Sequence, residues 1–259
     1  MAYSYGRVSR HDTQYPPIVR ELKAIFNELP DETLLNKLRG NPRRRGPKGY
    51  EVKTLWHCYI AYYYLGLPSV SDLIRCLHDT PFIAKACGID SASEIPSQPT
   101  FSRFGSRLAK FGIALAVKNL LRELVRRLYK TLPGFGKSVA MDATDIKAWS
   151  NAGKKGKYRK VGGKKRQKPR LAKVSDPDAG WCVKTNTEGN RKYVWGYKVH
   201  ILADTTYELP VAVAISAGNV HDSQKASALL SEARFTNNGF HPEYVIADAA
   251  YSSEVFRSL

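Results

Sequence analysis

Residues 138–146 read Ser-Val-Ala-Met-Asp-Ala-Thr-Asp-Ile, a short stretch with the composition of a β-strand and a carboxylate at its centre, Asp142. A second strand-like run, Tyr244 to Ala247, ends directly before Asp248. Two neighbouring strands that each bear an Asp bring carboxylates close enough to share divalent cations, which prefer hard oxygen ligands. A pair of such ions stabilises the attacking and leaving oxygens of a phosphoryl displacement. Position alone leaves open the ordinary alternative that each Asp is a cap or a turn residue.

Between these two segments the pattern predicts a hairpin and a helix. Residues 193–203 and 209–217 have the composition of two strands and are joined by a short polar turn. Asp222 is placed to cap a helix that runs through Phe235 and has one apolar face. The order strand, hairpin, helix, strand predicts a domain with helix and sheet.

The residues before this domain have the periodicity of helices. Apolar positions at steps of three and four predict a helix over residues 51–65 and a longer one over residues 113–128, with a basic exposed side. The cluster Pro133-Gly-Phe-Gly136 then interrupts the pattern and is the predicted boundary. We therefore expect the α+β class, with a helical domain over residues 1–132 and a mixed-sheet domain over residues 133–259.

Composition limits the class of protein. The chain has 259 residues, of which 43% are hydrophobic and 25% charged, proportions that are ordinary for a soluble globular protein. No apolar run approaches the ~20 residues that cross a bilayer, and the first residues lack the apolar core of a secretory signal. The four cysteines form no C-x-x-C pair and are expected to be free thiols. We expect a cytoplasmic protein without a membrane partner.

The positive charge is concentrated in one segment. The net charge is +18, and Gly153 to Lys173 alone holds eleven Lys and Arg and no acidic residue. A solvated loop of this kind attracts a polyanion such as DNA, although a solubilising role is the ordinary alternative. An acidic membrane surface is disfavoured because the segment offers no amphipathic helix. The predicted DNA-binding cations of this insertion, residues 153–173, are Lys154, Lys155, Lys157, Arg159, Lys160, Lys164, Lys165, Arg166, Lys168 and Arg170.

A second candidate DNA contact lies in the helical part. Arg103 and Arg107 are one helical turn apart, so both reach base edges if their helix enters a major groove. The alternative is that Phe101, Phe104 and Leu108 bury the segment and that the arginines touch only the DNA backbone.

Four segments in a fixed order carry a resemblance to a known family. They are Met141-Asp-Ala-Thr-Asp-Ile, Trp195-Gly-Tyr-Lys-Val-His-Ile-Leu-Ala-Asp, Ala217-Gly-Asn-Val-His-Asp-Ser and Ala247-Asp-Ala-Ala-Tyr-Ser-Ser. With Ile95-Pro-Ser-Gln-Pro-Thr-Phe-Ser-Arg-Phe before them, they resemble the DDE transposases of bacterial and archaeal insertion sequences. The resemblance implies a helical N-terminal domain and a ribonuclease-H-like catalytic domain.

The resemblance also implies roles for single residues. Asp142 and Asp248 correspond to the first and second catalytic acids, which bind Mg²⁺ or Mn²⁺. His221 and Asp222 lie in a recurrent family motif, and we assign them to helix capping and local hydrogen bonding. The family's third acid, a Glu on a later helix, has no counterpart. Glu254 is the only acid after Asp248, and it is better interpreted as a surface residue in the first turn of a helix.

The sequence thus predicts a transposase, truncated at its C-terminus and catalytically incomplete, that cleaves and joins DNA by a two-metal mechanism. Its partners are double-stranded DNA at the element ends and at the target, and further copies of itself on that DNA, so it is nucleoid-associated when bound. Two alternatives stay open. One is a truncated, non-catalytic DNA-binding protein that inhibits a complete copy, and the other is a metal-dependent nuclease of the same fold.

Overall fold

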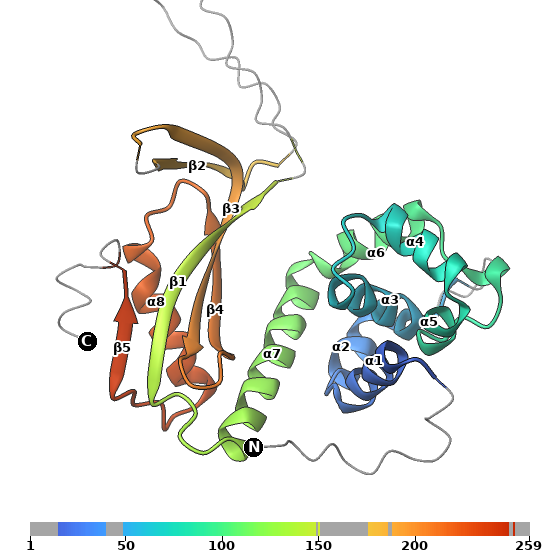
Figure 1. Cartoon of the computed structure of the whole chain (residues 1–259), viewed down its shortest axis with the longest axis horizontal. Helices are drawn as coiled ribbons and strands as arrows, with labels where there is room; N and C mark the ends of the chain where they lie inside the picture. Colours follow the sequence, from blue (N-terminus) through green and yellow to red (C-terminus); the bar gives the residue numbers. More distant parts are fainter. Residues whose placement is uncertain are drawn as a thin grey trace, which may run out of the picture. The chain divides into compact units, whose positions relative to one another are not determined.

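The structure is a computed structural model that describes residues 15–39, 49–148, 150, 176–185, 188–248 and 251. The chain divides into two compact units, residues 1–124 and residues 125–259, which are shown in Figure 1 and are described separately below. Among the described residues, none of the helices combines the length and the apolar character needed to cross a bilayer.

The first unit consists of helices. Proline opens several of them, where its missing N–H costs nothing, and Ser69 caps another by accepting a hydrogen bond from the main-chain N–H of Asp72 (3.2 Å). The elements are α1 (Pro17–Glu28), α2 (Glu32–Arg39), α3 (Val52–Tyr64), α4 (Val70–Asp79), α5 (Pro81–Ala86), the 3₁₀ turn η2 (Ala92–Glu94), α6 (Gln98–Leu108) and the start of α7 (Phe111–Thr131).

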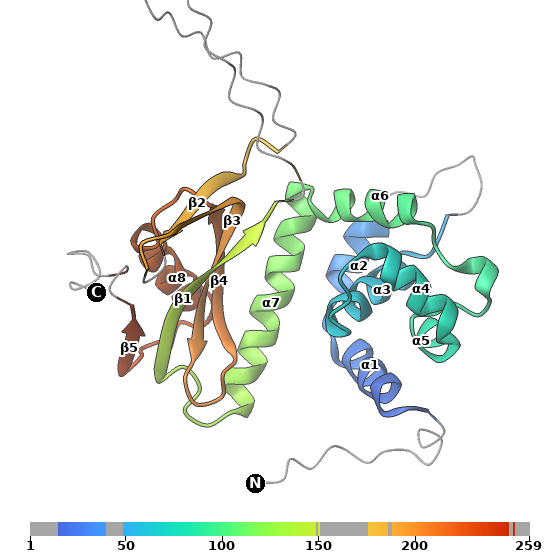
Figure 2. The ribbon, with the colours of Figure 1, turned by 45° about the horizontal axis from the view of Figure 1, so that its top comes forward.

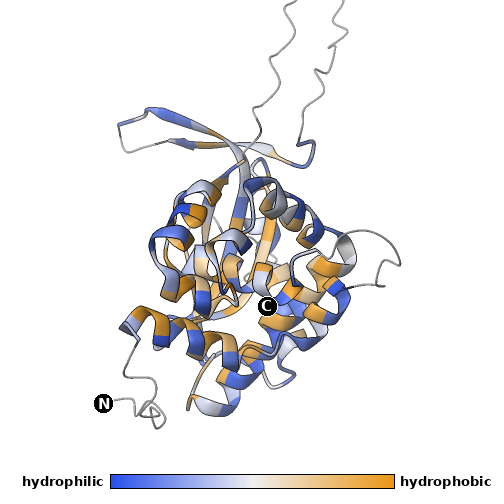
Figure 3. Cartoon of the chain, turned by 90° about the vertical axis from the view of Figure 1, so that its right-hand side faces the viewer, coloured by the Kyte–Doolittle hydropathy of each residue, from blue (hydrophilic) through white to orange (hydrophobic). Residues whose placement is uncertain are grey.

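One apolar core holds these helices together. Leu22 of α1, Leu73 of α4 and Phe101 of α6 are fully buried in it. Two polar side chains packed against this core find partners: the indole of Trp56 donates to Asp31 (2.9 Å), and the hydroxyl of Tyr59 donates to a main-chain oxygen in α6 (3.0 Å). Apolar and polar residues alternate around the helices (Figure 3), the pattern that amphipathic helices require.

The second unit contains a mixed five-stranded sheet. β1 pairs antiparallel with β3 and parallel with β5, while β2 and β4 both pair antiparallel with β3. The helix α8 packs on β4 and β3. β2 and the outer part of β3 form a ribbon that turns away from the rest of the sheet (Figure 2). The bounds are β1 (Ser138–Lys147), β2 (Gly180–Thr185), β3 (Arg191–Asp204), β4 (Pro210–Ala217), α8 (Ser223–Thr236) and β5 (Tyr244–Ala247).

The two faces of this sheet differ in burial. Side chains alternate between faces along a strand, and one face holds Val139, Met141 and Leu202, which are buried on the side of α8. The other face carries Asp142 and large apolar side chains that are at least half exposed, namely Ile146, Ile215, Tyr244 and Ile246. Asp142 therefore lies on the open face of the sheet.

The predicted fold class is confirmed, and the order strand, hairpin, helix, strand is observed from β1 to β5. Two features were not predicted. The short strand β2 escaped notice because polar and turn residues surround its five-residue run Trp-Cys-Val-Lys-Thr, and the helices α1, α2 and α5 were not located individually. The basic segment 153–173, with its ten predicted DNA-binding residues, and Glu254 lie outside the described residues.

Candidate active site

Asp142 and Asp248 are brought side by side by the parallel pairing of β1 and β5. In that pairing Met141 lies opposite Ala247, and each Asp is the next residue of its chain. Both side chains are exposed. One carboxylate oxygen of Asp142 accepts a hydrogen bond from the main-chain N–H of Ala143 (2.7 Å). The two acids predicted from separate stretches of sequence thus meet at one end of the strand pair.

The donor chemistry of this pair fits a divalent cation. Two carboxylates offer the hard oxygens that Mg²⁺ and Mn²⁺ prefer, and their exposure leaves room for water and for substrate oxygens around an ion. Within the described part of the chain, no group of three or more His, Cys, Asp and Glu side chains is arranged to hold a metal ion. The pair is therefore suited to supply two ligands of a site but not to enclose an ion.

A buried tyrosine lies near the carboxylates of Asp142 and Asp248. Tyr251 is 1% exposed, and its hydroxyl has no hydrogen-bond partner among the described residues. Burial raises the pKa of this phenol far above its ordinary value, and the carboxylates of Asp222, Asp142 and Asp248 raise it further. The phenol is therefore neutral, and the carboxylates of Asp142 and Asp248 lie close enough to act on it.

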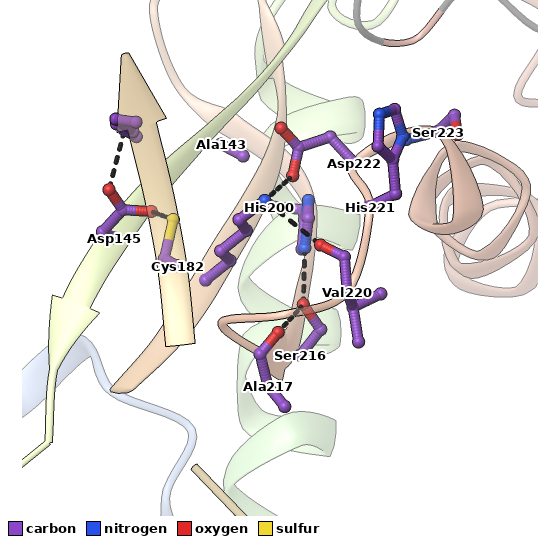
Figure 4. A network of polar contacts seen from close by, with 12 residues as sticks. Ala143, Asp145, Cys182, His200, Ser216, Ala217, Val220, His221, Asp222 and Ser223 are labelled. Carbon is purple, nitrogen blue, oxygen red and sulfur yellow. Dashed lines mark hydrogen bonds and ion pairs between the residues drawn. The ribbon is translucent and has the colours of Figure 1, made fainter. Parts of the chain in front are cut away.

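Asp222 does not do what the sequence suggested. It occupies the residue before α8, but its carboxylate makes no capping hydrogen bond, and its backbone is already helical (φ −62°, ψ −37°), unlike the extended backbone of a capping residue. The carboxylate instead accepts from the ammonium of Lys198 on β3 (2.8 Å), which also donates to the main-chain oxygen of Val220 (3.1 Å), as Figure 4 shows. The predicted capping role is wrong because the ion pair turns Asp222 toward the sheet.

The neighbours of Asp222 make local contacts. His221 pairs with Ser223 through its Nδ1 (2.8 Å), so the local hydrogen bonding predicted for His221 is confirmed. His200 is fully buried on β3, and its Nε2 contacts the hydroxyl of Ser216 (2.9 Å). Burial lowers the pKa of His200, although Asp222 opposes the shift. A neutral imidazole here serves packing and hydrogen bonding.

A second polar cluster lies on the opposite face of β1 and was missed by sequence reasoning. The carboxylate of Asp145 accepts from the thiol of Cys182 (3.0 Å) and from the ammonium of Lys184 (2.9 Å), both on β2 (Figure 4). Burial tends to raise the pKa of Asp145, but these two hydrogen bonds outweigh it and leave the pKa below its ordinary value. The pKa of Cys182 rises to about 11 through burial and through Asp145, so the thiol stays protonated.

The signal for this cluster was the spacing Asp-x-x-Asp in the first strand. An offset of three residues puts Asp142 and Asp145 on opposite faces of β1. The partners of Asp145, however, come from β2, so they become visible only once β2 is paired with β3. Lys198 lies directly opposite Asp145 in the β1–β3 register, which links this cluster to the Asp222 pair.

The two arginines predicted to contact DNA lie on α6. Arg103 is exposed and donates to the hydroxyl of Thr100 (3.3 Å). Arg107 is half-buried and donates to the main-chain oxygen of Leu38, at the end of α2. The two side chains therefore have different surroundings although they are one turn apart.

Comparison with known proteins agrees with this architecture. Residues 7–107 match the family model described as "Transposase domain (DUF772)", and residues 133–259 match the model described as "Transposase DDE domain". No curated protein and no solved structure gives a significant match. The second model covers the sheet with Asp142 and Asp248, and the first covers α1 to α6, in the order that the sequence predicted. Because two transposase models in this order span most of its length, the chain belongs to the DDE transposases of insertion sequences.

Proposed function

We propose that this chain acts on the DNA of an insertion sequence, cleaving a phosphodiester at the element's ends and joining the freed 3′-hydroxyl to target DNA. The observation that carries the proposal is the adjacency of Asp142 and Asp248 on the open face of the sheet, within a transposase DDE domain. Members of this family use divalent metal and bind DNA, and the charge of +18 suits a polyanionic substrate.

The role proposed for Asp142 and Asp248 is to hold Mg²⁺ or Mn²⁺ through their carboxylate oxygens. A bound pair of such ions would supply Lewis-acid stabilisation of the charge on the phosphate oxygens. The chain's own contribution is positional: β1 and β5 fix the two carboxylates, and Lys198 holds Asp222 in an ion pair. Since the described residues supply two carboxylates, we propose that they hold Mg²⁺ weakly and that water and DNA oxygens complete the coordination.

The test uses a duplex that carries an element end, incubated with the chain in Mg²⁺ and in Mn²⁺. Asp142→Asn and Asp248→Asn remove a metal ligand with little change of volume, so each should reduce strand cleavage at least 100-fold, as expected when a metal ligand is lost. DNA affinity should stay within about twofold, because neither carboxylate attracts phosphate. Cleavage that persists in Asp142→Asn would overturn the assignment of the site.

The two carboxylates found among the described residues also favour a second candidate function. A site with two carboxylates, on a chain with abundant positive charge, is suited to occupy element ends without cutting them, as an inhibitor of an active copy. Under that function, wild-type chain binds element ends, releases no cleaved strand in either metal, and lowers cleavage by an active transposase added to the same reaction. A nuclease of the same fold would instead give cut ends without strand-transfer products.

The proposed partners are double-stranded DNA and further copies of the chain assembled on it. Transposition joins two element ends to one target, so a complex with several copies on paired ends is expected. Sedimentation with and without a duplex bearing two ends measures this directly. We propose that the protein works in the cytoplasm, associated with the nucleoid while it is bound to DNA.

A further inference from the structure

A small hollow in the helical unit is lined by positive charge. Its volume is about 190 Å³, and it lies where α2 ends, α6 ends and α7 begins. No carboxylate lines it in the described part of the chain. We call it the cationic hollow, because four of its six lining residues are cations. The six residues are Lys37, Leu38, Arg39, Arg107, Lys110 and Ile113.

Neutral acceptors fix two of these cations in place. Arg107 donates to the main-chain oxygen of Leu38, in the last turn of α2, and Arg39 donates to the side-chain oxygen of Asn36 (2.8 Å). A main-chain or amide oxygen orients a guanidinium without neutralising it. Arg107, whose contact is half-buried, therefore keeps its charge in a restricted position, which lowers the entropic cost of binding an anion, whereas the contact of Arg39 is exposed.

The start of α7 adds to the positive potential. The main-chain oxygen of Lys110 accepts from the N–H groups of Ile113 (2.9 Å) and Ala114 (2.8 Å), so the first turn of this 21-residue helix forms one wall of the hollow. The N-terminus of α7 carries partial positive charge, whereas the C-terminal ends of α2 and α6 at the same hollow carry partial negative charge, which the four cations exceed. The four cations of the hollow repel one another and the N-terminus of α7. A bound anion relieves that repulsion.

We propose that the cationic hollow binds a phosphate group of the DNA backbone. Its volume admits a phosphate but is too small for a nucleotide with its base, since pockets for larger ligands begin at about 300 Å³. Guanidinium groups suit phosphate because their N–H donors match its oxygens in pairs. A contact of this kind carries no sequence information, but it fixes the register of the protein on the duplex. The inference rests on the proposed function in DNA binding and adds the place of one backbone contact.

The assignment separates the two arginines of α6. Arg107 becomes a backbone contact, since it lines the hollow with three other cationic residues. Arg103 is exposed, lies outside the hollow and remains the residue proposed to read a base edge. Substitution of Arg107 should therefore weaken binding to all duplexes alike. Substitution of Arg103 should weaken binding to element ends more than binding to random DNA.

The test compares Lys37→Gln/Lys110→Gln with the matched control Lys53→Gln/Lys85→Gln. Both variants lose two positive charges from the helical unit, but only the first pair lines the hollow. We expect the hollow variant to bind element ends and random duplexes about tenfold more weakly and to lower the slope of log K against log[salt] by about one, as for the loss of one phosphate contact, whereas the control should change affinity less than threefold. Thermal unfolding of both variants checks that the fold is kept, and Arg107→Lys, which retains the charge but loses paired donation, should weaken binding at least threefold.

A second arm uses inorganic phosphate and distinguishes the source of the ligand. Equal losses of DNA affinity in the hollow variant and in the control overturn the proposal, because general charge then explains them. If DNA binding is unchanged but 10 mM phosphate raises the Tm of the wild type and not of the hollow variant, the hollow takes a free anion, and the DNA assignment is wrong. If the wild type binds no DNA, the proposed function fails, and the phosphate arm alone decides whether the hollow is an anion site.

Discussion

At the scale of single residues, a buried imidazole ties the stability of the helical unit to pH. His57 is 7% exposed, stacks on Phe26 with ring centres 4.0 Å apart, and has no partner for its Nε2 among the described residues. Burial, with a smaller effect of Lys53, lowers its pKa from 6.5 to about 4. The unfolded chain therefore takes up a proton below pH 6.5 that the folded chain refuses until pH 4. Stability should fall across this window, by about 2 kcal/mol.

Urea unfolding at pH 7 and at pH 4.5 measures this loss, and His57→Phe supplies the control. The variant keeps an aromatic ring against Phe26 but has no proton to bind, so its stability should depend less on pH. Asp31, whose pKa is raised mainly by burial, acts in the opposite direction in both proteins, so the difference between them isolates His57. An identical pH dependence in the two proteins would contradict the prediction.

The position of a residue on a strand was predictable where one short stretch contains the whole signal. Asp142 and Asp248 each stand in or directly after an apolar run, so the strand and its carboxylate could be recognised together. The role of Asp222 could not be predicted in this way. A capping residue and an ion-paired residue look alike in sequence, and the partner that decides between them, Lys198, is 24 residues away on another strand.

At the scale of elements, three glycines allow strands and a loop to approach closely. A Cβ added to Gly196 on β3 would lie 2.0 Å from the main-chain oxygen of Ile146 and 2.7 Å from the nitrogen of Ala148. Gly180 and Gly218 are equally restricted by neighbouring atoms. Backbone atoms of paired strands cannot move aside without breaking hydrogen bonds of the sheet. Only glycine therefore fits where β1, β2 and β3 meet.

Gly196→Ala should lower the free energy of unfolding by about 3 kcal/mol, the range of overpacked sites, while Gly112→Ala should raise it by about 0.5 kcal/mol. Gly112 is the matched control, because it lies in the first turn of α7 with no atom within 4 Å of an added Cβ. Unfolding of each full-length variant in guanidinium chloride measures both changes in the free energy of unfolding. Gly196→Ala with wild-type stability would show that the strands shift apart at little cost.

The ion pair of Lys198 and Asp222 connects the loop before α8 to β3. The two side chains are 14% and 23% exposed, so the pair is mostly withdrawn from water. Lys198→Met removes the partner of a half-buried carboxylate and should lower the free energy of unfolding by about 2 kcal/mol. The loss is smaller than the loss expected when a fully buried pair is broken. Asp222→Asn should lower the free energy of unfolding by less, because the ammonium of Lys198 keeps its hydrogen bond to the main-chain oxygen of Val220. A double-mutant cycle should give a coupling energy near 1 kcal/mol, and additive effects would show that the pair contributes nothing.

Elements with a strong period were predictable, and those held by distant partners were not. α3 and α7 show apolar residues at helical steps over three or more turns, and the β3–β4 hairpin shows two strand-like runs around one turn. β2 has only six residues, and its stability comes from pairing with the outer part of β3 and from the contacts of Asp145. Its own sequence contains little of that information.

At the scale of the whole molecule, the positive charge is unevenly distributed along the chain and points to a polyanionic partner. Composition and net charge predicted a polyanionic partner without any structure, since +18 on 259 residues far exceeds what solubility requires. The proposed position of one contact with the DNA backbone, by contrast, could be found only from the structure. The cationic hollow gathers residues 37–39 and 107–113, which are separated by three helices along the chain.

The segment Gly153–Lys173 allows the sharpest test of this charge argument, because eleven cations without one acid should dominate non-specific affinity. A protein that neutralises Z phosphates of duplex DNA shows a slope of log K against log[salt] near −0.9Z. Replacing five cations with alanine, in the variant Lys154→Ala/Lys155→Ala/Lys164→Ala/Lys165→Ala/Arg166→Ala, removes up to five such contacts. The slope should therefore fall by about 2 to 4, and binding to unrelated duplexes at 100 mM salt should weaken at least 100-fold.

The stability of the variant should change little, since the replaced residues are all charged and are not expected to contribute to a core. Its matched control exchanges the same five residues between Lys and Arg, which keeps the charge and should keep the slope. Fluorescence anisotropy with a labelled random duplex, measured from 50 to 300 mM salt, gives both slopes. An unchanged slope in the alanine variant would mean that these cations face away from DNA, and the positive charge of the helical unit, including the cationic hollow, would then have to account for the affinity.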